Sequence, residues 1–220
     1  MRRAVFPLLL FLFGFVLGLL CLFPIHTMSP ELGAAPMTAA ARSGEESAPA
    51  REASTSGLLR AAARAAEALK AEDYGALGNL VHPERGLTFT ASSTVDLEAD
   101  RNFTADEIRG LTKNSRQYLW GYEDGRGDPI LLTMEEFMQQ YIFAVDYTQA
   151  PEVGVDQVVL SGNALENVAQ AYPGCRFVDL CYPELDPDFG GLDWCSLKLV
   201  FAPLEGQWRL VGLIHSQWTI

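Results

Sequence analysis

Residues 194–218 have the sequence WCSLKLVFAPLEGQWRLVGLIHSQW, which predicts a long antiparallel β-hairpin. Glu205-Gly206 supplies a two-residue turn of the kind that joins such strands. In the register of that turn Leu199 faces Gly212, and the apolar residues on this side form one buried face. A third strand is expected at residues 175–182, so the end of the chain is mostly sheet.

The other face of the predicted hairpin is also apolar, although a sheet with one solvent face alternates apolar and polar residues. We therefore expect something to cover it, and a twofold homodimer is the simplest candidate. The alternative is a helix of the same chain, predicted at residues 163–171. The expected dimer contact consists of Trp194, Val200, Val211 and Leu213.

Helical and strand patterns alternate in the chain before this sheet. Ser56 and Thr133 are expected helix caps, and Thr104 with Glu107 forms a capping box. Apolar spacing predicts helices at residues 58–69, 74–81, 134–143 and 163–171, and strands at residues 86–90, 117–123 and 155–160. Helices followed by long antiparallel strands predict an α+β fold.

The order of these elements resembles the nuclear transport factor 2-like (cystatin-like) fold, a cone in which a curved antiparallel sheet wraps N-terminal helices. Several stretches are similar to an uncharacterised family of secreted or lipid-anchored bacterial proteins: 82–86 (HPERG), 120–122 (WGY), 125–130, 150–155, 193–194, 196–201 and 210–220 (LVGLIHSQWTI). The resemblance covers most of residues 75–220. It implies the fold and an extracytoplasmic location, and it transfers no catalytic residue.

The N-terminus predicts a membrane segment. Arg2-Arg3 precedes an uncharged apolar run at residues 4–23, and about 20 helical residues span a bilayer. The arginines place the N-terminus in the cytoplasm. Residues 1–23 are therefore a signal anchor, with the domain outside the cytoplasm, or a cleaved signal peptide that leaves a secreted protein. Residues 24–57, rich in Ala, Ser, Pro and Glu, predict a disordered tether, and residues 58–220 predict one globular domain.

Charge excludes one class of partner. The 220 residues carry a net charge of −12, and residues 1–57 hold equal numbers of acids and bases, so the whole excess lies in residues 58–220. Phosphate binding needs clustered Lys and Arg, so a nucleic-acid partner is not expected. No motif in the sequence predicts a metal or a cofactor.

The cysteines of the domain offer one cross-link. If the loop between the strands is centred on Asp188, Cys181 stands opposite Cys195, and an extracytoplasmic location would allow a disulfide. The alternative is that these two and Cys175 are small buried thiols.

A cone fold would place a pocket at the end of the sheet. The candidate pocket residues are His82, Trp120, Tyr122, Asp179, Asp193 and Trp218. A buried aspartate beside aromatic rings could act as a general base, although such polar groups also commonly hydrogen-bond the backbone at a sheet end.

Two functions follow from these features. The tether, the lack of a catalytic motif and the apolar hairpin favour a membrane-tethered or secreted extracytoplasmic binding or interaction module. The alternative is a small pocket enzyme with isomerase-like or dehydratase-like acid–base chemistry, using Asp179 or Asp193 with His82.

Overall fold

A computed structural model describes residues 48–123 and 126–219 of the chain, with the side chains of all of these residues except 48–54 and Thr112. The predicted membrane segment at residues 4–23 and residues 24–47 of the predicted tether lie outside these residues, whereas residues 48–57 of that tether are helical. Among the helices that are described, none is long and apolar enough to cross a bilayer.

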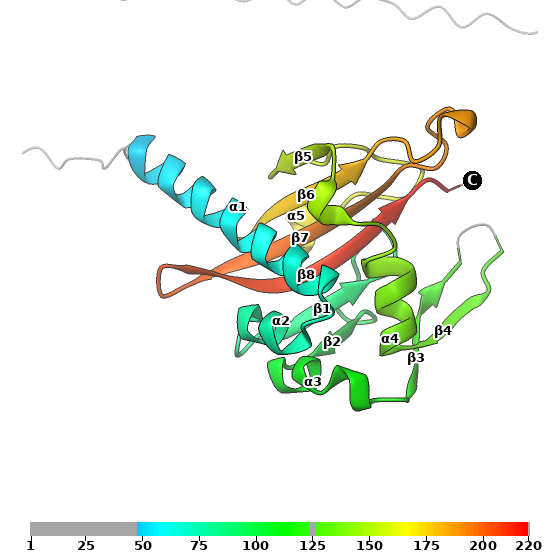
Figure 1. The fold of residues 1–220 in the computed structure, drawn as a ribbon, viewed down its shortest axis with the longest axis horizontal. Coiled ribbons are helices and arrows are strands. Elements are labelled where there is room, and N and C mark those ends of the chain that lie inside the picture. Colours follow the sequence, from blue (N-terminus) through cyan, green and yellow to red (C-terminus); the bar gives the residue numbers. More distant parts are fainter. Residues whose placement is uncertain (1–47, 124–125, 220) are drawn as a thin grey trace, which may run out of the picture. The chain divides into compact units, whose positions relative to one another are not determined.

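The main sheet has six strands in the order β2-β1-β8-β7-β6-β5 (Figure 1). Neighbouring strands are antiparallel except β1 and β8, which run parallel. The strands are β1 (Leu87–Thr90), β2 (Arg101–Phe103), β5 (Glu152–Val155), β6 (Arg176–Tyr182), β7 (Cys195–Leu204) and β8 (Gln207–Gln217). A separate antiparallel ribbon consists of β3 (Gln117–Tyr122) and β4 (Pro129–Thr133).

Helices lie on both faces of the main sheet (Figure 1). They are α1 (Ala48–Lys70), α2 (Tyr74–Leu80), α3 (Ala105–Arg109), α4 (Met134–Phe137) and α5 (Val168–Ala171). A π-helical turn, Met138–Ile142, continues α4, and single 3-10 turns occur at Leu111–Lys113, Tyr147–Gln149 and Pro187–Phe189. The α+β class predicted from the sequence is confirmed.

The first core lies between α1 and the sheet. Residues of α1 at helical spacing (Leu58, Ala61, Ala62, Ala65, Ala66 and Leu69) are buried there. Alanine at four of these positions lets the helix backbone approach the sheet closely. At the other end of this core Trp120 stacks on Phe137, with ring centroids 3.9 Å apart and an angle of 6° between the rings. Apolar side chains therefore fill the space that a cone fold would offer as a pocket.

The second core covers the opposite face of the sheet. Val95, Val168 and Tyr172 pack there against Phe177 and the outer face of β7 and β8. Asn167 ties the two covering segments together, because its side chain both accepts from the amide of Val95 and donates to its carbonyl. The chain itself thus covers this face.

This arrangement corrects the predicted exposed patch. Trp194, Val200, Val211 and Leu213 are at most 6% exposed, so they do not form a free surface for a second subunit. The structure shows the alternative, in which a segment of the same chain covers this face. Only Val168–Ala171 of the expected helix at 163–171 is helical, and the rest of that segment is irregular.

The hairpin register agrees with the prediction only near its turn. Leu204 pairs with Gln207 around Glu205-Gly206, both of which have positive φ, as a two-residue turn requires. A bulge then shifts β8 by one residue, so Leu199 faces Leu213 rather than Gly212. Leu213 therefore belongs to the first core, and the predicted outward position of Leu213 is wrong.

Helix starts were predicted more accurately. Thr104 with Glu107 forms a capping box before α3, and Thr133 with Glu136 forms another before α4. The cap predicted at Ser56 is wrong, because α1 begins at Ala48 and Ser56 lies inside it.

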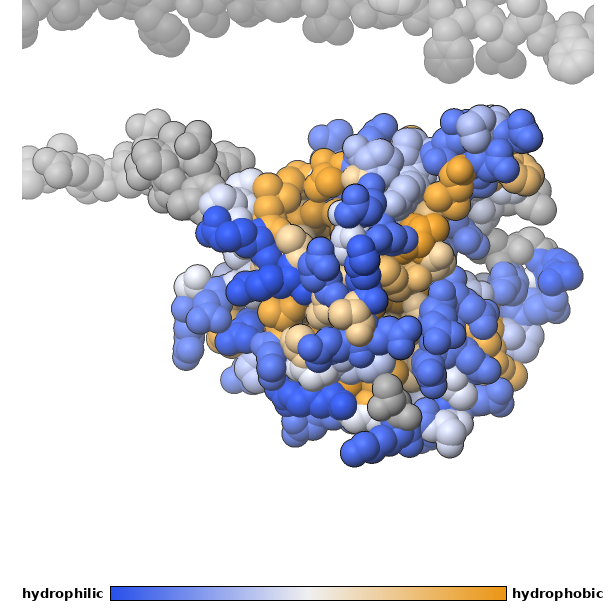
Figure 2. Space-filling view, viewed as in Figure 1, coloured by the Kyte–Doolittle hydropathy of each residue, from blue (hydrophilic) through white to orange (hydrophobic). Residues whose placement is uncertain are grey.

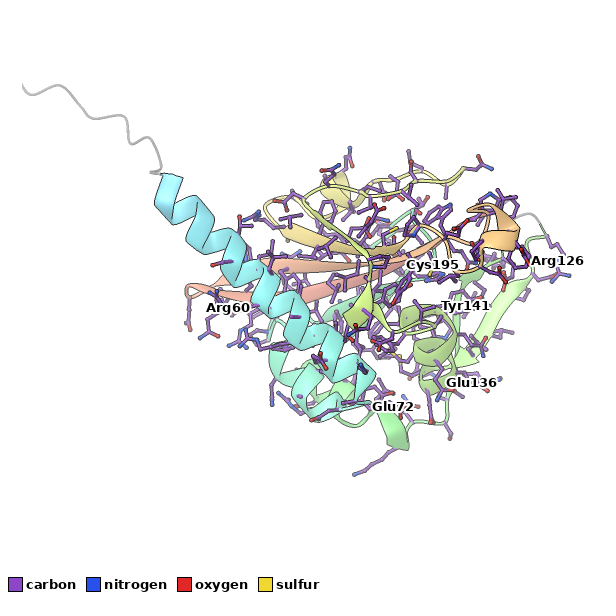
Figure 3. The ribbon with its side chains drawn as sticks, turned by 45° about the horizontal axis from the view of Figure 1, so that its top comes forward. Arg60, Glu72, Arg126, Glu136, Tyr141 and Cys195 are labelled. Atoms are coloured by element: carbon purple, nitrogen blue, oxygen red, sulfur yellow. The ribbon has the colours of Figure 1, made fainter. Side chains whose placement is uncertain are left out.

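The predicted disulfide is not formed. Cys181 pairs with Ser196, whereas Cys195 at the start of β7 (Figure 3) pairs with Tyr182. The two thiols therefore point to opposite faces of the sheet, because adjacent register positions alternate sides. The three cysteines of the described residues are free thiols, and burial raises the pKa of Cys181 to about 12.

Candidate functional site

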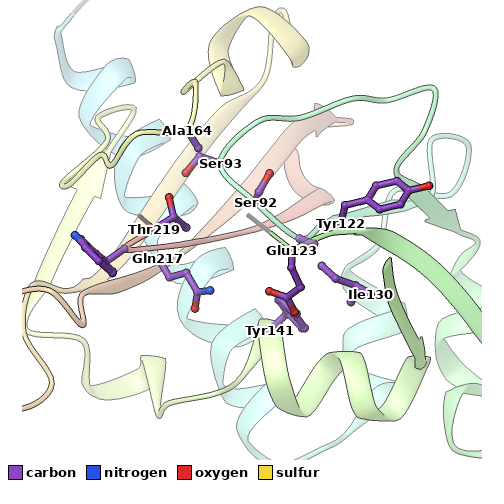
Figure 4. A pocket seen from close by; sticks show the side chains of 11 residues that line it. Ser92, Ser93, Tyr122, Glu123, Ile130, Tyr141, Ala164, Gln217 and Thr219 are labelled. Atoms are coloured by element: carbon purple, nitrogen blue, oxygen red, sulfur yellow. The ribbon is translucent and has the colours of Figure 1, made fainter. Parts of the chain in front are cut away.

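A cavity of about 170 Å³ lies at the edge of the sheet where β1 and β8 both end (Figure 4). Because these strands are parallel, their carboxyl ends meet at the same edge. The β3–β4 ribbon and the π-helical turn form the other side. The cavity is lined by Ala91, Ser92, Ser93, Tyr122, Glu123, Ile130, Tyr141, Ala164, Gln217, Trp218 and Thr219.

One wall of the cavity is a tyrosine–carboxylate pair. The hydroxyl of Tyr141 donates to Oε1 of Glu123 at 2.9 Å. Burial, and then this hydrogen bond, raise the pKa of Tyr141 well above its usual range, so the phenol stays protonated. Tyr141 projects from the π-helical turn that follows α4 (Figure 3), and its ring stacks on Phe137 at 5.0 Å. The capping box of α4 and the aromatic core thus fix the position of this wall.

His215 lies behind that wall. Its ring meets the Tyr141 ring edge-on at 5.5 Å, and the residue is 2% exposed. Burial lowers the pKa of His215 to about 4. Among the described residues, neither ring nitrogen has a partner of ordinary hydrogen-bond geometry. The Gln217 side chain and the Tyr141 backbone favour the protonated ring and so reduce the lowering of the pKa. The imidazole is therefore neutral at pH 7, and Tyr141 separates it from the cavity.

Aromatic rings form the rim. Tyr122 is 63% exposed and Trp218 is 37% exposed, and both line the cavity. Exposed aromatic side chains beside a few polar groups are typical of small-ligand sites. These two are the predicted pocket residues that the structure brings together here.

The other four predicted residues lie elsewhere. His82 accepts two backbone hydrogen bonds within its own turn, and Trp120 is buried with Nε1 donating to the carbonyl of Leu132 at 2.9 Å. Asp193 accepts from two amides of the β6–β7 connection. Asp179 lies on the second face of the sheet, where it accepts from the amide of Val159 at 2.9 Å.

Sequence reasoning missed the polar residues of the cavity, above all Ser93, Glu123 and Tyr141. The signal that could have found Ser93 is the pair Ser92-Ser93, which follows a fully buried strand after the single residue Ala91. Its link to β8, however, depends on parallel pairing between segments more than a hundred residues apart.

A second cavity, of about 200 Å³, is an apolar groove between α1, the Tyr147–Gln149 turn and strands β5 and β6. Figure 2 shows hydrophobic residues exposed beside α1, and Leu59 and Val153 are among the exposed apolar side chains. Within residues 48–123 and 126–219, no three His, Cys, Asp or Glu side chains cluster in a way that could hold a metal ion.

Comparisons with known proteins give distant structural likenesses. No family model matches the chain, and no curated protein matches it. A protein of unknown function from the DUF3225 family of Pectobacterium atrosepticum is 10% identical, over 74% of this chain and 90% of that one, with a TM-score of 0.35. An NTF2-like protein of unknown function from Shewanella baltica is 8% identical, over 77% and 97%, with a TM-score of 0.32.

A third solved structure is a putative calcium/calmodulin dependent protein kinase II association domain from Xanthomonas campestris. It is 12% identical, over 81% of this chain and 92% of that one, with a TM-score of 0.31. All three TM-scores are too low to carry an argument about function. What the structure itself defines is an α+β domain with a helix packed on one face of a six-stranded sheet and a polar cavity at the sheet edge.

Proposed function

We propose that the chain is an extracytoplasmic binding module of NTF2-like fold that takes a small polar ligand in the cavity at the ends of β1 and β8. The observation that carries the proposal is the contrast between two spaces. The groove between α1 and the sheet is lined almost entirely by apolar side chains, whereas the sheet-edge cavity is lined by hydroxyl, amide, carboxylate and aromatic groups.

The lining suits binding more than acid–base catalysis. The Glu123 carboxylate already accepts a hydrogen bond from Tyr141, and His215 is screened from the cavity by the same ring. Exposed rings at the rim offer flat apolar area, and the groups below offer hydrogen bonds that orient a ligand.

The pocket-enzyme alternative has one observation in its favour. Asp179 is fully buried, and its Oδ1 has no hydrogen-bond partner among the described residues. A buried carboxylate of this kind is a candidate general base. Asp179 lines neither cavity described above, however, so a substrate in either one would not reach it.

The location outside the cytoplasm rests on the apolar run at residues 4–23 and the two arginines before it. The test is protease treatment of intact bacterial spheroplasts that express the full chain. The proposal expects the domain to be cut or released from outside, while a cytoplasmic marker protein stays intact. Protection of the domain until the spheroplasts are lysed would refute this location.

The binding test is a thermal-shift screen of the full chain with sugars, polyols, amino acids and nucleosides. A ligand that binds only the folded state raises the melting temperature by mass action. We expect at least one class to do so, and Trp218→Ala or Tyr122→Ala to remove the effect. Phe189→Ala, which truncates an exposed aromatic residue outside the cavity, should keep it. A screen without any stabilising compound, or stabilisation that survives all three changes, would refute the proposed site.

A further inference from the structure

Lys198 is an unusual charged group, because its side chain on the central strand β7 is fully buried. Lysine is almost never fully buried unless it is paired. Its Nζ lies 3.2 Å from Oε1 of Glu166 and 2.6 Å from Oγ of Ser216. Glu166 comes from the segment that covers the second face, so this ion pair also holds the cover to the sheet.

The lysine is connected to the sheet-edge cavity through two serine hydroxyls. The first hydroxyl is that of Ser216 on strand β8. Its Oγ, which accepts from Lys198, also lies 3.0 Å from Oγ of Ser93. Ser93 follows β1 and lines the cavity (Figure 4), whereas Ser216 is 1% exposed and does not line it. The described groups therefore form a continuous chain from Glu166 through Lys198 and Ser216 to Ser93.

The ammonium group sets the direction of this chain. An ammonium only donates, so the oxygen of Ser216 accepts from Lys198. The hydroxyl proton of Ser216 then needs an acceptor. The neighbouring hydroxyl of Ser196 has no hydrogen-bond partner among the described residues, which leaves Ser93. Ser93 accepts this proton and has its own proton free to donate into the cavity.

This geometry makes Ser93 a polarised donor rather than a nucleophile. A serine is activated for attack by a base that removes its proton. Here the charged end of the chain is an ammonium paired with a carboxylate, so it supplies hydrogen bonds and takes up no proton. Hydrogen bonds in such chains strengthen one another. A ligand oxygen at Ser93 therefore accepts a hydrogen bond that the Lys198 ammonium polarises, while Glu166 balances the charge of that ammonium.

The opposite wall presents the complementary group. Glu123 belongs to the β3–β4 side of the cavity and is exposed, and Tyr141 occupies only its Oε1. We propose that the cavity binds a small zwitterion of the amino-acid class, with the carboxylate on Ser93 and the ammonium on Glu123. This inference rests on the proposed binding function and gives it a ligand class.

Three amino acids with different charge separations test the inference: glycine, β-alanine and 4-aminobutyrate, added to the full chain at millimolar concentration and followed by calorimetry. Propionate and propylamine each keep one of the two charged ends. We expect at least one zwitterion to bind about tenfold more tightly than either single-ended probe, because it alone pairs both walls.

Two variants separate the ends. Ser93→Ala should weaken zwitterion binding by about tenfold and leave propylamine binding unchanged, while Glu123→Gln should weaken zwitterion binding and leave propionate binding unchanged. Ser92→Ala is the matched control, because Ser92 lines the same cavity but has no link to Lys198. Lys198→Met should reproduce the Ser93→Ala defect if the variant folds. If it does not fold, the comparison of Ser93→Ala with Ser92→Ala tests the inference.

The outcomes distinguish the inference from the binding function on which it rests. Equal binding of zwitterions and single-ended probes, equal effects of the two serine variants, or no zwitterion binding at all would overturn the ligand class. If other compounds still bind in a manner that depends on Trp218, the binding function stands. If no compound binds in that manner, the proposed function fails as well.

Discussion

At the residue scale, the burial of His215 makes the free energy of unfolding depend on pH. Burial lowers its folded-state pKa to about 4 from an ordinary value of 6.5, so the unfolded chain binds a proton between these values and the folded chain does not. The stabilisation is complete above about pH 6.5 and is lost as the pH falls toward 4. Urea unfolding near neutral pH and near pH 4 should therefore differ by roughly 3 kcal/mol from this group alone.

The control is His215→Gln, which removes the titrating group. The free energy of unfolding of this variant should depend less steeply on pH in that window than that of the wild type, while carboxylates contribute equally to both. Identical pH dependence of the two proteins would contradict the assignment to His215.

A second prediction at this scale concerns thiol reactivity. Cys181 and Cys195 are buried and burial raises the pKa of both thiols, whereas Cys175 is partly exposed. The thiolate is the reactive form, so maleimide should modify Cys175 in the native protein and the other two only after unfolding. Peptide mapping without reductant measures this. A Cys181–Cys195 cross-linked peptide would show that the observed register is wrong.

At the element scale, the capping box of α4 positions one wall of the cavity. The Thr133 hydroxyl accepts from the amide of Glu136, whose carboxylate accepts in turn from the amide of Thr133. Thr133→Ala should lower the free energy of unfolding by about 1 kcal/mol, whereas Thr133→Ser keeps the hydroxyl and should have little effect. Equal loss in both variants, measured by chemical denaturation, would assign the effect to the threonine methyl group instead.

Gly212 follows the bulge in β8 and lies against the ring of Tyr172. A Cβ atom at this position would lie 2.7 Å from the Tyr172 hydroxyl and 2.9 Å from the adjoining ring carbon. Gly212→Ala should therefore destabilise the protein by roughly 1–3 kcal/mol through overpacking. Gly110→Ala is the matched control, since its nearest contact would be an ordinary 3.5 Å. The assignment fails if calorimetry finds equal melting temperatures for the two variants.

These elements show what the sequence could predict. Caps and the Glu205-Gly206 turn depend on neighbours in the chain, so local spacing was sufficient to find them. The bulge lies beside Gly212, which packs against Tyr172 from another segment, and its shift of one residue moves Leu213 to the opposite face. In the cavity, Tyr122 and Trp218 were predicted, whereas Ser93 depends on the distant pairing of β1 with β8.

At the scale of the whole domain, the sheet is covered on both faces by the same chain. This explains why β7 and β8 are apolar on both sides around Val200 and Val211, a pattern that otherwise suggests an interface. It also explains how polar groups come to lie on the second face. Lys198, Ser196 and Asp179 lie toward one end of that face, and the apolar cluster around Val200 and Val211 lies toward the other.

The cover leads to a prediction about Val211, which is 2% exposed and packs with Val200 in the second core. Val211→Asp would bury an unpaired carboxylate inside the chain, so the folded state should lose about 3 kcal/mol or more. The control is Val153→Asp on the edge strand β5, where the side chain is 51% exposed and the change should be within about 0.5 kcal/mol. Urea unfolding and sedimentation of the wild type and both variants measure stability and mass together. A Val211→Asp protein that keeps its stability but sediments as a smaller species than the wild type would show that this face is an interface between subunits and that the intramolecular cover is wrong.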